Sequence, residues 1–207
     1  MEREAVKKLF GKNFIGKDEL KPFFKALGFG EVEIQEKPME YSDSDLQKAA
    51  KEGYILIYGV EQINGQHITL RFLRDIVGVN PGVSEPCLYN QDWYLKEDFM
   101  DLFLNAQWYL IKKDVYDDSR AVKPGDLTQR GLNFPPAILC GYTFFAYFYA
   151  RNEYLWWHDF VWCCDTDHNG DRIYVGKYHD IDDVNKNGFS IHRHLALRFC
   201  YGSVNCM

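Results

Sequence analysis

Apolar positions in the first part of the chain recur with the period of helices and then change to the two-residue period of a strand. The helical spacing predicts short helices over 2–10 and 18–27, followed by a third over 45–51. Ser44 is placed to cap this third helix. Residues 54–60 are β-branched, aromatic and alternating, which predicts a strand.

The next segment permits two interpretations. Asn64-Gly65 is a hairpin turn signal, so 67–72 could pair back as the second strand of a hairpin. We favour a helix over 69–77, because its leucines and isoleucine follow the 3.6-residue period. Farther along, the pattern predicts a helix over 95–105 and a strand over 108–115.

A polar stretch over 117–133, interrupted by proline and glycine, separates these elements from an apolar segment. Long polar stretches of this kind are typical of mobile loops or lids, and this one could also be a boundary between 1–116 and 134–207. The apolar segment over 135–150 is hydrophobic on every face, which predicts a buried central helix. We predict a single globular domain over 1–207.

After this helix the pattern becomes that of strands separated by turns. Strands are predicted over 155–162, 172–178 and 190–201. Helices that precede strands, rather than alternate with them, indicate the α+β class. The predicted fold is therefore α+β, with a helical N-terminal half and a C-terminal antiparallel β-meander packed on a buried apolar helix.

Composition narrows the classes of function. The chain has 207 residues, of which 46% are hydrophobic and 26% charged, as in an ordinary globular protein. Its net charge of −6 and the lack of a dense Lys/Arg run argue against a nucleic-acid partner, because such proteins neutralise phosphates with basic patches. The charged N-terminus does not resemble a signal peptide, and 134–150 is too short to span a membrane. We therefore expect a cytoplasmic protein without a membrane partner, and free thiols rather than disulfides or zinc ligands.

The segment 165–171 reads Asp-Thr-Asp-His-Asn-Gly-Asp and resembles the opening of a calcium-binding loop. Alternating carboxylates around a glycine bend supply the oxygen ligands that hard cations require. The EF-hand pattern has a glutamate at its twelfth position, however, and Gly176 stands there. Asn169-Gly170 between two strands is also a hairpin signal on its own, and a similar spacing recurs over 183–191. A hairpin turn and a cation site both remain as interpretations.

Histidines gather in the same part of the chain. His192 and His194 alternate along a predicted strand, so both imidazoles face the same side, as metal ligands can. Together with nearby aspartates they could hold a divalent cation that activates water. The predicted metal ligands are Asp165, Asp167, Asn169, Asp171, His192 and His194.

Aromatic residues make up 16% of the chain, which predicts either an aromatic core or a binding surface. Tryptophan and tyrosine are enriched where proteins bind partners. Trp93 and Tyr94 follow a proline-containing loop, and Trp156 and Trp157 lie together in the first C-terminal strand run. We predict these four residues as ligand- or partner-binding.

Motifs for hydrolase nucleophiles, phosphate-binding loops and dinucleotide binding are absent from the sequence. Glu97, Asp98 and Asp101 lie on one predicted helix, and we interpret them as its solvated face. The first hypothesis is therefore a non-enzymatic binding protein with a protein partner. The alternative is a metal-dependent hydrolase that uses the C-terminal His/Asp cluster.

Overall fold

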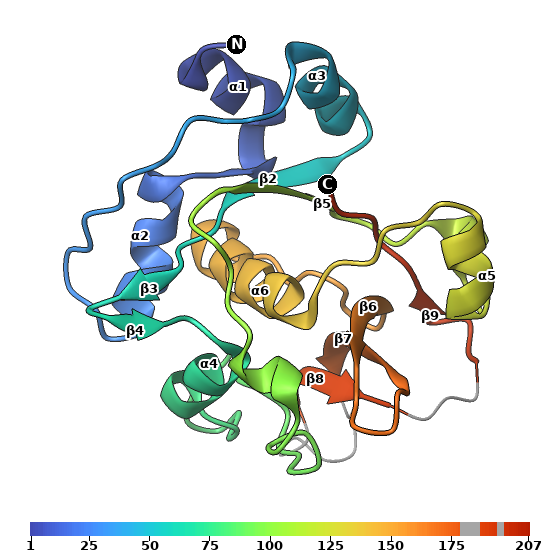
Figure 1. Ribbon diagram of the computed structural model, residues 1–207. Coiled ribbons are helices and arrows are strands. Elements are labelled where there is room, and N and C mark those ends of the chain that lie inside the picture. Colours follow the sequence, from blue (N-terminus) through green and yellow to red (C-terminus); the bar gives the residue numbers. More distant parts are fainter. Residues whose placement is uncertain (179–186, 194–196) are drawn as a thin grey trace.

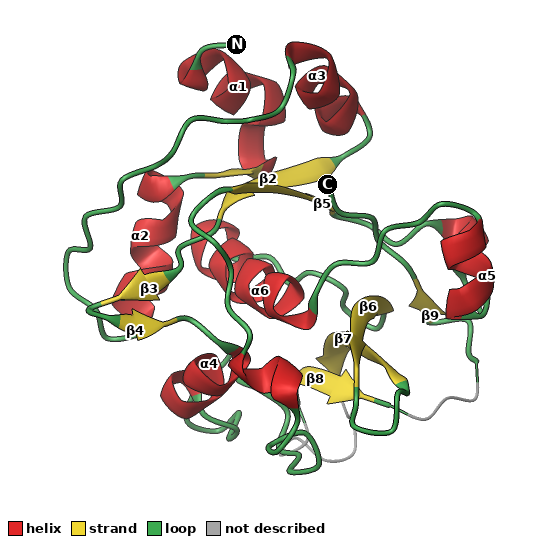
Figure 2. Ribbon diagram, in the orientation of Figure 1, coloured by secondary structure: helices red, strands yellow, loops and turns green. Residues whose placement is uncertain are grey.

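The computed structural model describes residues 1–178, 187–193 and 197–207, and its architecture is α+β with most helices in the first half (Figures 1 and 2). The helices are α1 (Arg3–Phe10), η1 (Gly11–Asn13), α2 (Lys17–Ala26), α3 (Asp43–Lys51), α4 (Leu70–Val77), η2 (Asp98–Asp101), η3 (Asp117–Ser119), α5 (Pro124–Gln129) and α6 (Ala137–Arg151). The strands are β1 (Phe14–Ile15), β2 (Tyr54–Tyr58), β3 (Gln62–Ile63), β4 (Gln66–His67), β5 (Trp108–Lys112), β6 (Phe160–Thr166), β7 (Arg172–Tyr178), β8 (Gly188–His192) and β9 (Tyr201–Gly202).

The first helices end close to where the pattern predicted, and short polar side chains cap two of them. The cap of α3 is Ser42 rather than Ser44, and its hydroxyl accepts a hydrogen bond from the Asp45 N–H at 3.2 Å. Thr69 caps α4 in the same way, accepting from the Phe72 N–H at 3.0 Å. The favoured helix over 69–77 is confirmed as α4, and 67–72 is not the second strand of a hairpin, because only Gln66–His67 pairs back, with Gln62–Ile63.

A small sheet in the first half places β2 between β1 and β5. β2 runs parallel to β1 and antiparallel to β5. Every residue of β2 is buried, as expected for a central strand covered on both faces. This sheet forms one wall of the core.

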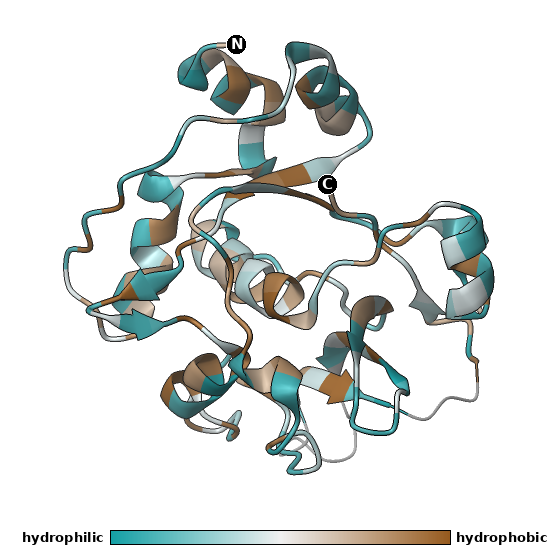
Figure 3. Ribbon diagram, viewed as in Figure 1, coloured by the Kyte–Doolittle hydropathy of each residue, from teal (hydrophilic) through white to brown (hydrophobic). Residues whose placement is uncertain are grey.

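Helix α6 lies at the centre of the molecule, as the uniformly apolar segment predicted (Figure 1). Its residues are buried from Ala137 to Tyr147, whereas α1 and α3 alternate hydrophilic and hydrophobic stretches at the surface (Figure 3). The buried Tyr142 hydroxyl donates to the Tyr58 carbonyl at 3.1 Å and so fixes α6 to β2. Most of the large aromatic side chains belong to this core, which accounts for much of the aromatic surplus.

The C-terminal sheet packs against α6 and has the strand order β8-β7-β6-β9. It is largely antiparallel, but β9 pairs parallel to β6, so the sheet is not a simple meander. Alternate residues face opposite sides. Val161 and Val175 face the core with α6, whereas Trp162 and Tyr174 join a second cluster with Leu127 of α5.

Four predicted elements are wrong. The strand predicted over 190–201 is not continuous, because β8 ends at His192 and β9 begins only at Tyr201. The segment 95–105 forms only the short helix η2. The Leu95 carbonyl accepts a hydrogen bond from the Arg71 guanidinium at 2.9 Å, and Phe103 forms a β-bridge with Thr69, so neither end of the segment makes the hydrogen bonds of a helix. The polar stretch 117–133 contains η3 and α5 rather than being a loop throughout. The strand predicted from residue 155 begins only at Phe160.

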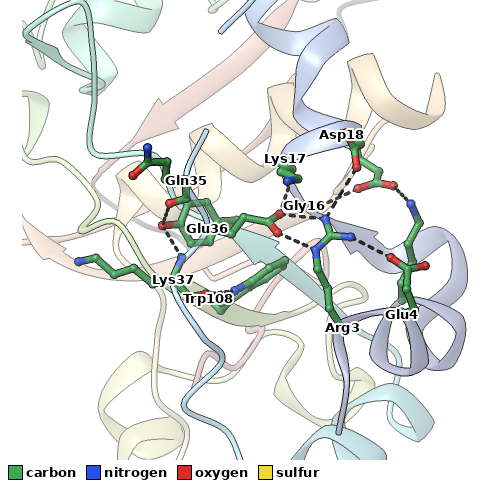
Figure 4. A network of polar contacts seen from close by, with 12 residues as sticks. Arg3, Glu4, Gly16, Lys17, Asp18, Gln35, Glu36, Lys37 and Trp108 are labelled. Atoms are coloured by element: carbon green, nitrogen blue, oxygen red, sulfur yellow. Dashed lines mark hydrogen bonds and ion pairs between the residues drawn. The ribbon is translucent and has the colours of Figure 1, made fainter. Parts of the chain in front are cut away.

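The long connection between α2 and α3 is held to α1 through Glu36 and to the first sheet through Lys37 (Figure 4). The Arg3 guanidinium donates to both Glu36 oxygens, at 2.6 and 3.1 Å. The Lys37 N–H donates to the Tyr58 hydroxyl at 3.1 Å, and the Trp108 indole donates to the Lys37 carbonyl at 2.9 Å. These contacts explain why a segment without secondary structure has a defined path.

The described core draws residues from both sides of 117–133, while the domain organisation itself stays a prediction. Among the described residues, no helix combines the length and the apolar character needed to cross a bilayer.

Candidate functional site

A cleft of about 360 Å³ lies beside the connection between α6 and β6. Residues from 113–120, which follow β5, form one side, and residues from 153–159 form the other. We call it the Trp157 cleft, after the most exposed aromatic side chain in its lining, which is 44% exposed.

The backbone on either side of Trp157 adopts a left-handed conformation. Trp156 has a φ of 49° and His158 a φ of 64°, values that bulky residues rarely adopt because their Cβ atoms crowd the backbone. The Trp156 side chain is buried, and its indole donates to the Lys113 carbonyl at 3.0 Å. The side chain of Trp156 is therefore held in the interior, whereas that of Trp157 faces solvent.

A buried cation supports Trp157 from behind. The Lys177 ammonium lies 5.7 Å from the Trp157 ring centroid and 4.9 Å from that of Tyr154. It donates to Glu85 Oε1 at 2.8 Å, and the Tyr154 hydroxyl donates to the same oxygen at 2.7 Å. Burial, followed by the contact with Glu85, raises the pKa of Tyr154, so this hydroxyl stays a donor. Lys177, Tyr154 and Glu85 thus hold one another in place next to the Trp157 ring through one ion pair and one hydrogen bond.

Glycine at position 176 allows this connection to lie directly against β7. A Cβ atom there would come within 2.1 Å of the Asp159 carbonyl oxygen. Only glycine permits so close an approach of two backbone segments. The residue that breaks the EF-hand pattern therefore has a structural role of its own.

Ion pairs cross the Trp157 cleft from one side to the other. Arg120 donates to both oxygens of Asp159, at 2.6 and 3.1 Å, and to Asp117 at 3.1 Å. Lys113 forms an ion pair with Glu153. The hydrogen bonds that Arg120 donates to Asp159 raise the pKa of Arg120, which keeps the guanidinium charged.

The cations of these pairs lie deeper than the carboxylates. The side chains of Lys113 and Arg120 are 14% and 15% exposed. Those of Glu153, Asp159 and Asp117 are 40%, 30% and 95% exposed. A partner that approaches the cleft therefore meets carboxylates first.

A second polar cluster joins the residue before η2 to the turn between β6 and β7. Glu97 and Asp167 are buried there. The ring Nδ1 of His168 lies 2.6 Å from Glu97 Oε1, and its backbone N–H donates to Oε2 at 2.8 Å. One ligand-type atom from each of the three residues lies within 4.8 Å of the others, so this group could hold a metal ion.

Arg193 already supplies positive charge to this cluster. Its Nη1 atom donates to Asp167 Oδ2 at 2.8 Å and lies 3.9 Å from Glu97 Oε1. The guanidinium also lies over the Trp93 ring, 4.5 Å from its centroid. We call these five residues (Trp93, Glu97, Asp167, His168 and Arg193) the Arg193 cluster.

Asp167 has protein partners at both carboxylate oxygens. Oδ1 accepts the backbone N–H groups of Asn169 and Asp171, each at 2.9 Å, while Oδ2 accepts from Arg193. Burial opposes ionisation, but these hydrogen bonds outweigh it and lower the pKa of Asp167 to about 2. A cation that bound Asp167 would therefore have to displace Arg193.

Of the other predicted metal ligands, Asp165 is a helix cap. Its Oδ2 accepts the Ala137 N–H at 2.6 Å, which places a carboxylate at the positive N-terminus of α6. Burial raises its pKa in spite of this bond. Among the residues that the structure describes, Asp165 does not belong to the metal-capable group.

Of the two histidines in the predicted metal set, the structure describes His192. His192 lies on β8 with its ring stacked on Tyr174, the centroids 5.3 Å apart. Burial lowers the pKa of His192 to about 4, so the ring is neutral near pH 7. His194 lies outside the described residues. The six-residue set stays a prediction, of which the structure places Asp167 in a group that could hold a metal.

The predicted partner-binding aromatics fall into different environments. Trp93 is half-buried and donates to a backbone carbonyl of β8 at 3.2 Å. Tyr94 is fully buried, and Trp156 is an inward anchor. Trp157 is the one of the four with a large exposed surface. Its role in partner binding stays a prediction.

The sequence alone did not identify all the residues of the Trp157 cleft or of the Arg193 cluster. Glu97 is buried, so the prediction of a solvated helix face is wrong for this residue. Its partner His168 lies 71 positions away, and no local spacing links the two. Arg120 and Arg193 likewise have no distinguishing sequence signal, because their roles depend on which aspartate the fold brings to them.

The chain matches no family model, and it has no significant match among curated proteins or solved structures.

Proposed function

We propose that the protein is a non-enzymatic binding protein whose recognition site is the Trp157 cleft. The observation that carries this proposal is the outward-facing Trp157 on a strained connection, supported by Lys177 and bordering a cleft of about 360 Å³. Backbone strain persists where the surrounding structure imposes it, and it clusters at binding sites. Exposed tryptophan beside a concavity is also the side chain that most often dominates binding energy.

A random peptide library displayed on phage tests this proposal, because it samples many partner chemistries at once. We expect selection on the wild-type protein to enrich peptides that lose at least about tenfold in affinity on Trp157→Ala, since interface tryptophans typically contribute that much or more. Titration calorimetry with synthetic copies of the enriched peptides gives the affinities.

Phe103→Ala is the matched control, because Phe103 is 41% exposed and does not line the cleft. Its effect on the same peptides should stay within about twofold, as for a surface residue outside the interface. Enriched peptides that bind Trp157→Ala as tightly as wild type would exclude the Trp157 cleft as the recognition site.

Cation binding is the second candidate, favoured by the group of Glu97, Asp167 and His168. The His168 side chain is 65% exposed, so a bound cation would have a solvent-facing side where water could coordinate. The metal-dependent hydrolase requires such a water, and it therefore depends on this group binding a metal in the first place.

A further inference from the structure

Resting on the proposed function, we infer that the Trp157 cleft takes a basic segment of another protein, in which Arg or Lys side chains alternate with apolar ones.

The sign of charge at the mouth of the cleft favours a cation. Its lining contains four carboxylates against two cations. Glu153 and Asp159 are neutralised by Lys113 and Arg120, whereas Asp114 is exposed at the rim. Asp117, which shares Arg120 with Asp159, is 95% exposed and adds to the negative rim. An incoming guanidinium or ammonium can therefore pair with Asp114, or with Asp117 beside its exposed contact to Arg120, without breaking the Lys113–Glu153 and Arg120–Asp159 pairs.

An acidic or phosphorylated segment would find no cation at the rim to pair with among the described residues that line the cleft, because both lining cations are already paired. The two cations that line the cleft, Lys113 and Arg120, are the deeper members of their pairs. Each would have to leave its carboxylate, which would then remain partly buried beside a second negative charge. The net charge of −6 on the whole chain acts in the same direction over longer range.

Two exposed rings explain why apolar side chains should accompany the basic ones. Phe199 is 75% exposed and its ring lies 5.3 Å from the Arg120 guanidinium carbon. Arg120 also donates to the Phe199 carbonyl at 3.4 Å. Trp157 lines the same cleft as Arg120. A peptide segment bound across the cleft would thus contact the exposed rings of Trp157 and Phe199 as well as the acidic rim.

Three synthetic twelve-residue peptides test the inference directly. One alternates Arg and Leu, and the matched peptides replace every Arg by Gln or by Glu. We expect calorimetry at low salt to show the Arg peptide binding at least about tenfold tighter than the Gln peptide, and the Glu peptide not binding. The affinity of the Arg peptide should fall as salt is added, because the rim charges are solvent-exposed.

Variants locate the effect. Asp114→Asn combined with Asp117→Asn should weaken the Arg peptide about tenfold and leave the Gln peptide unchanged. Asp75→Asn with Asp98→Asn removes the same charge from exposed positions outside the lining, and it should change the affinity by less than about twofold.

The outcomes separate the inference from the function on which it rests. If Trp157-dependent peptides from the library are neutral or acidic, or if the Gln or Glu peptide binds as tightly as the Arg peptide, the basic partner is wrong while the recognition site stands. If the Arg peptide binds Trp157→Ala unchanged, its site lies elsewhere and the inference is overturned. If the library gives no Trp157-dependent peptide, the proposed function itself falls.

Discussion

The Trp157 cleft and the Arg193 cluster use the same residue types, yet they differ in what they leave open to a partner. Each contains an arginine paired with an aspartate beside a tryptophan. In the cleft, Asp159 keeps 30% of its side chain exposed, whereas the Asp167 side chain is 0% exposed. Water therefore screens the Arg120–Asp159 pair more strongly than the Arg193–Asp167 pair, and the buried pair should matter more for stability.

The largest difference should appear when the two arginines are removed. Arg193→Met leaves Glu97 and Asp167 buried without their cation, and we expect the melting temperature to fall by roughly 10 °C. Arg120→Met leaves Asp159 partly in water and should cost only a few degrees. Thermal unfolding followed by circular dichroism measures both. Equal losses, or a larger loss for Arg120→Met, would break the distinction between the two regions.

As the pH falls, the protein should lose the stability contributed by neutral His192 before it loses that contributed by ionised Asp167. His192 has its pKa lowered from 6.5 to about 4 by burial, so folding disfavours its protonated form. Its contribution is present above pH 6.5 and is lost as the pH falls toward 4, by up to about 3 kcal/mol of unfolding free energy. The contribution of Asp167, whose pKa is about 2, is lost only as the pH falls from about 4 toward 2.

Urea unfolding across this pH range tests the order of these events. His192→Phe should flatten the curve between pH 6.5 and 4, while His67→Gln, at an exposed position, should leave it as in wild type. A wild-type stability that stays constant from pH 6.5 to 4 would show that folding does not bury His192 in its neutral form.

The smallest effect concerns metal ions. Wild-type protein should show little thermal shift with Mn²⁺, Zn²⁺, Ca²⁺ or Mg²⁺, because Arg193 occupies Asp167 Oδ2. Arg193→Gln frees this oxygen, and a saturating cation should then raise the melting temperature of the variant by a few degrees through binding to the folded state. A shift in wild type that disappears in Asp167→Asn would instead show that a metal displaces Arg193, and it would favour the second candidate.

Local patterns sufficed for much of the fold because the determining contacts are short in sequence. The period of apolar residues identified α1 to α3, and the wholly apolar segment identified α6. The strand β7 was predicted with its observed bounds, 172–178. In contrast, the helical pattern of 95–105 did not give a full helix, because Arg71 forms hydrogen bonds with Leu95 and Asp101, 24 and 30 positions away in the chain.

The candidate site divides in the same way. The sequence by itself marked Trp157 and Asp167 as notable residues, and it determined the α+β class and the central helix. Only the tertiary structure decided that Trp157 faces outward, that Asp165 caps α6, and that Arg193 holds Asp167. The physical reason is that burial and charge pairing depend on neighbours distant in sequence, whereas helix and strand periodicity is set by residues a few positions apart.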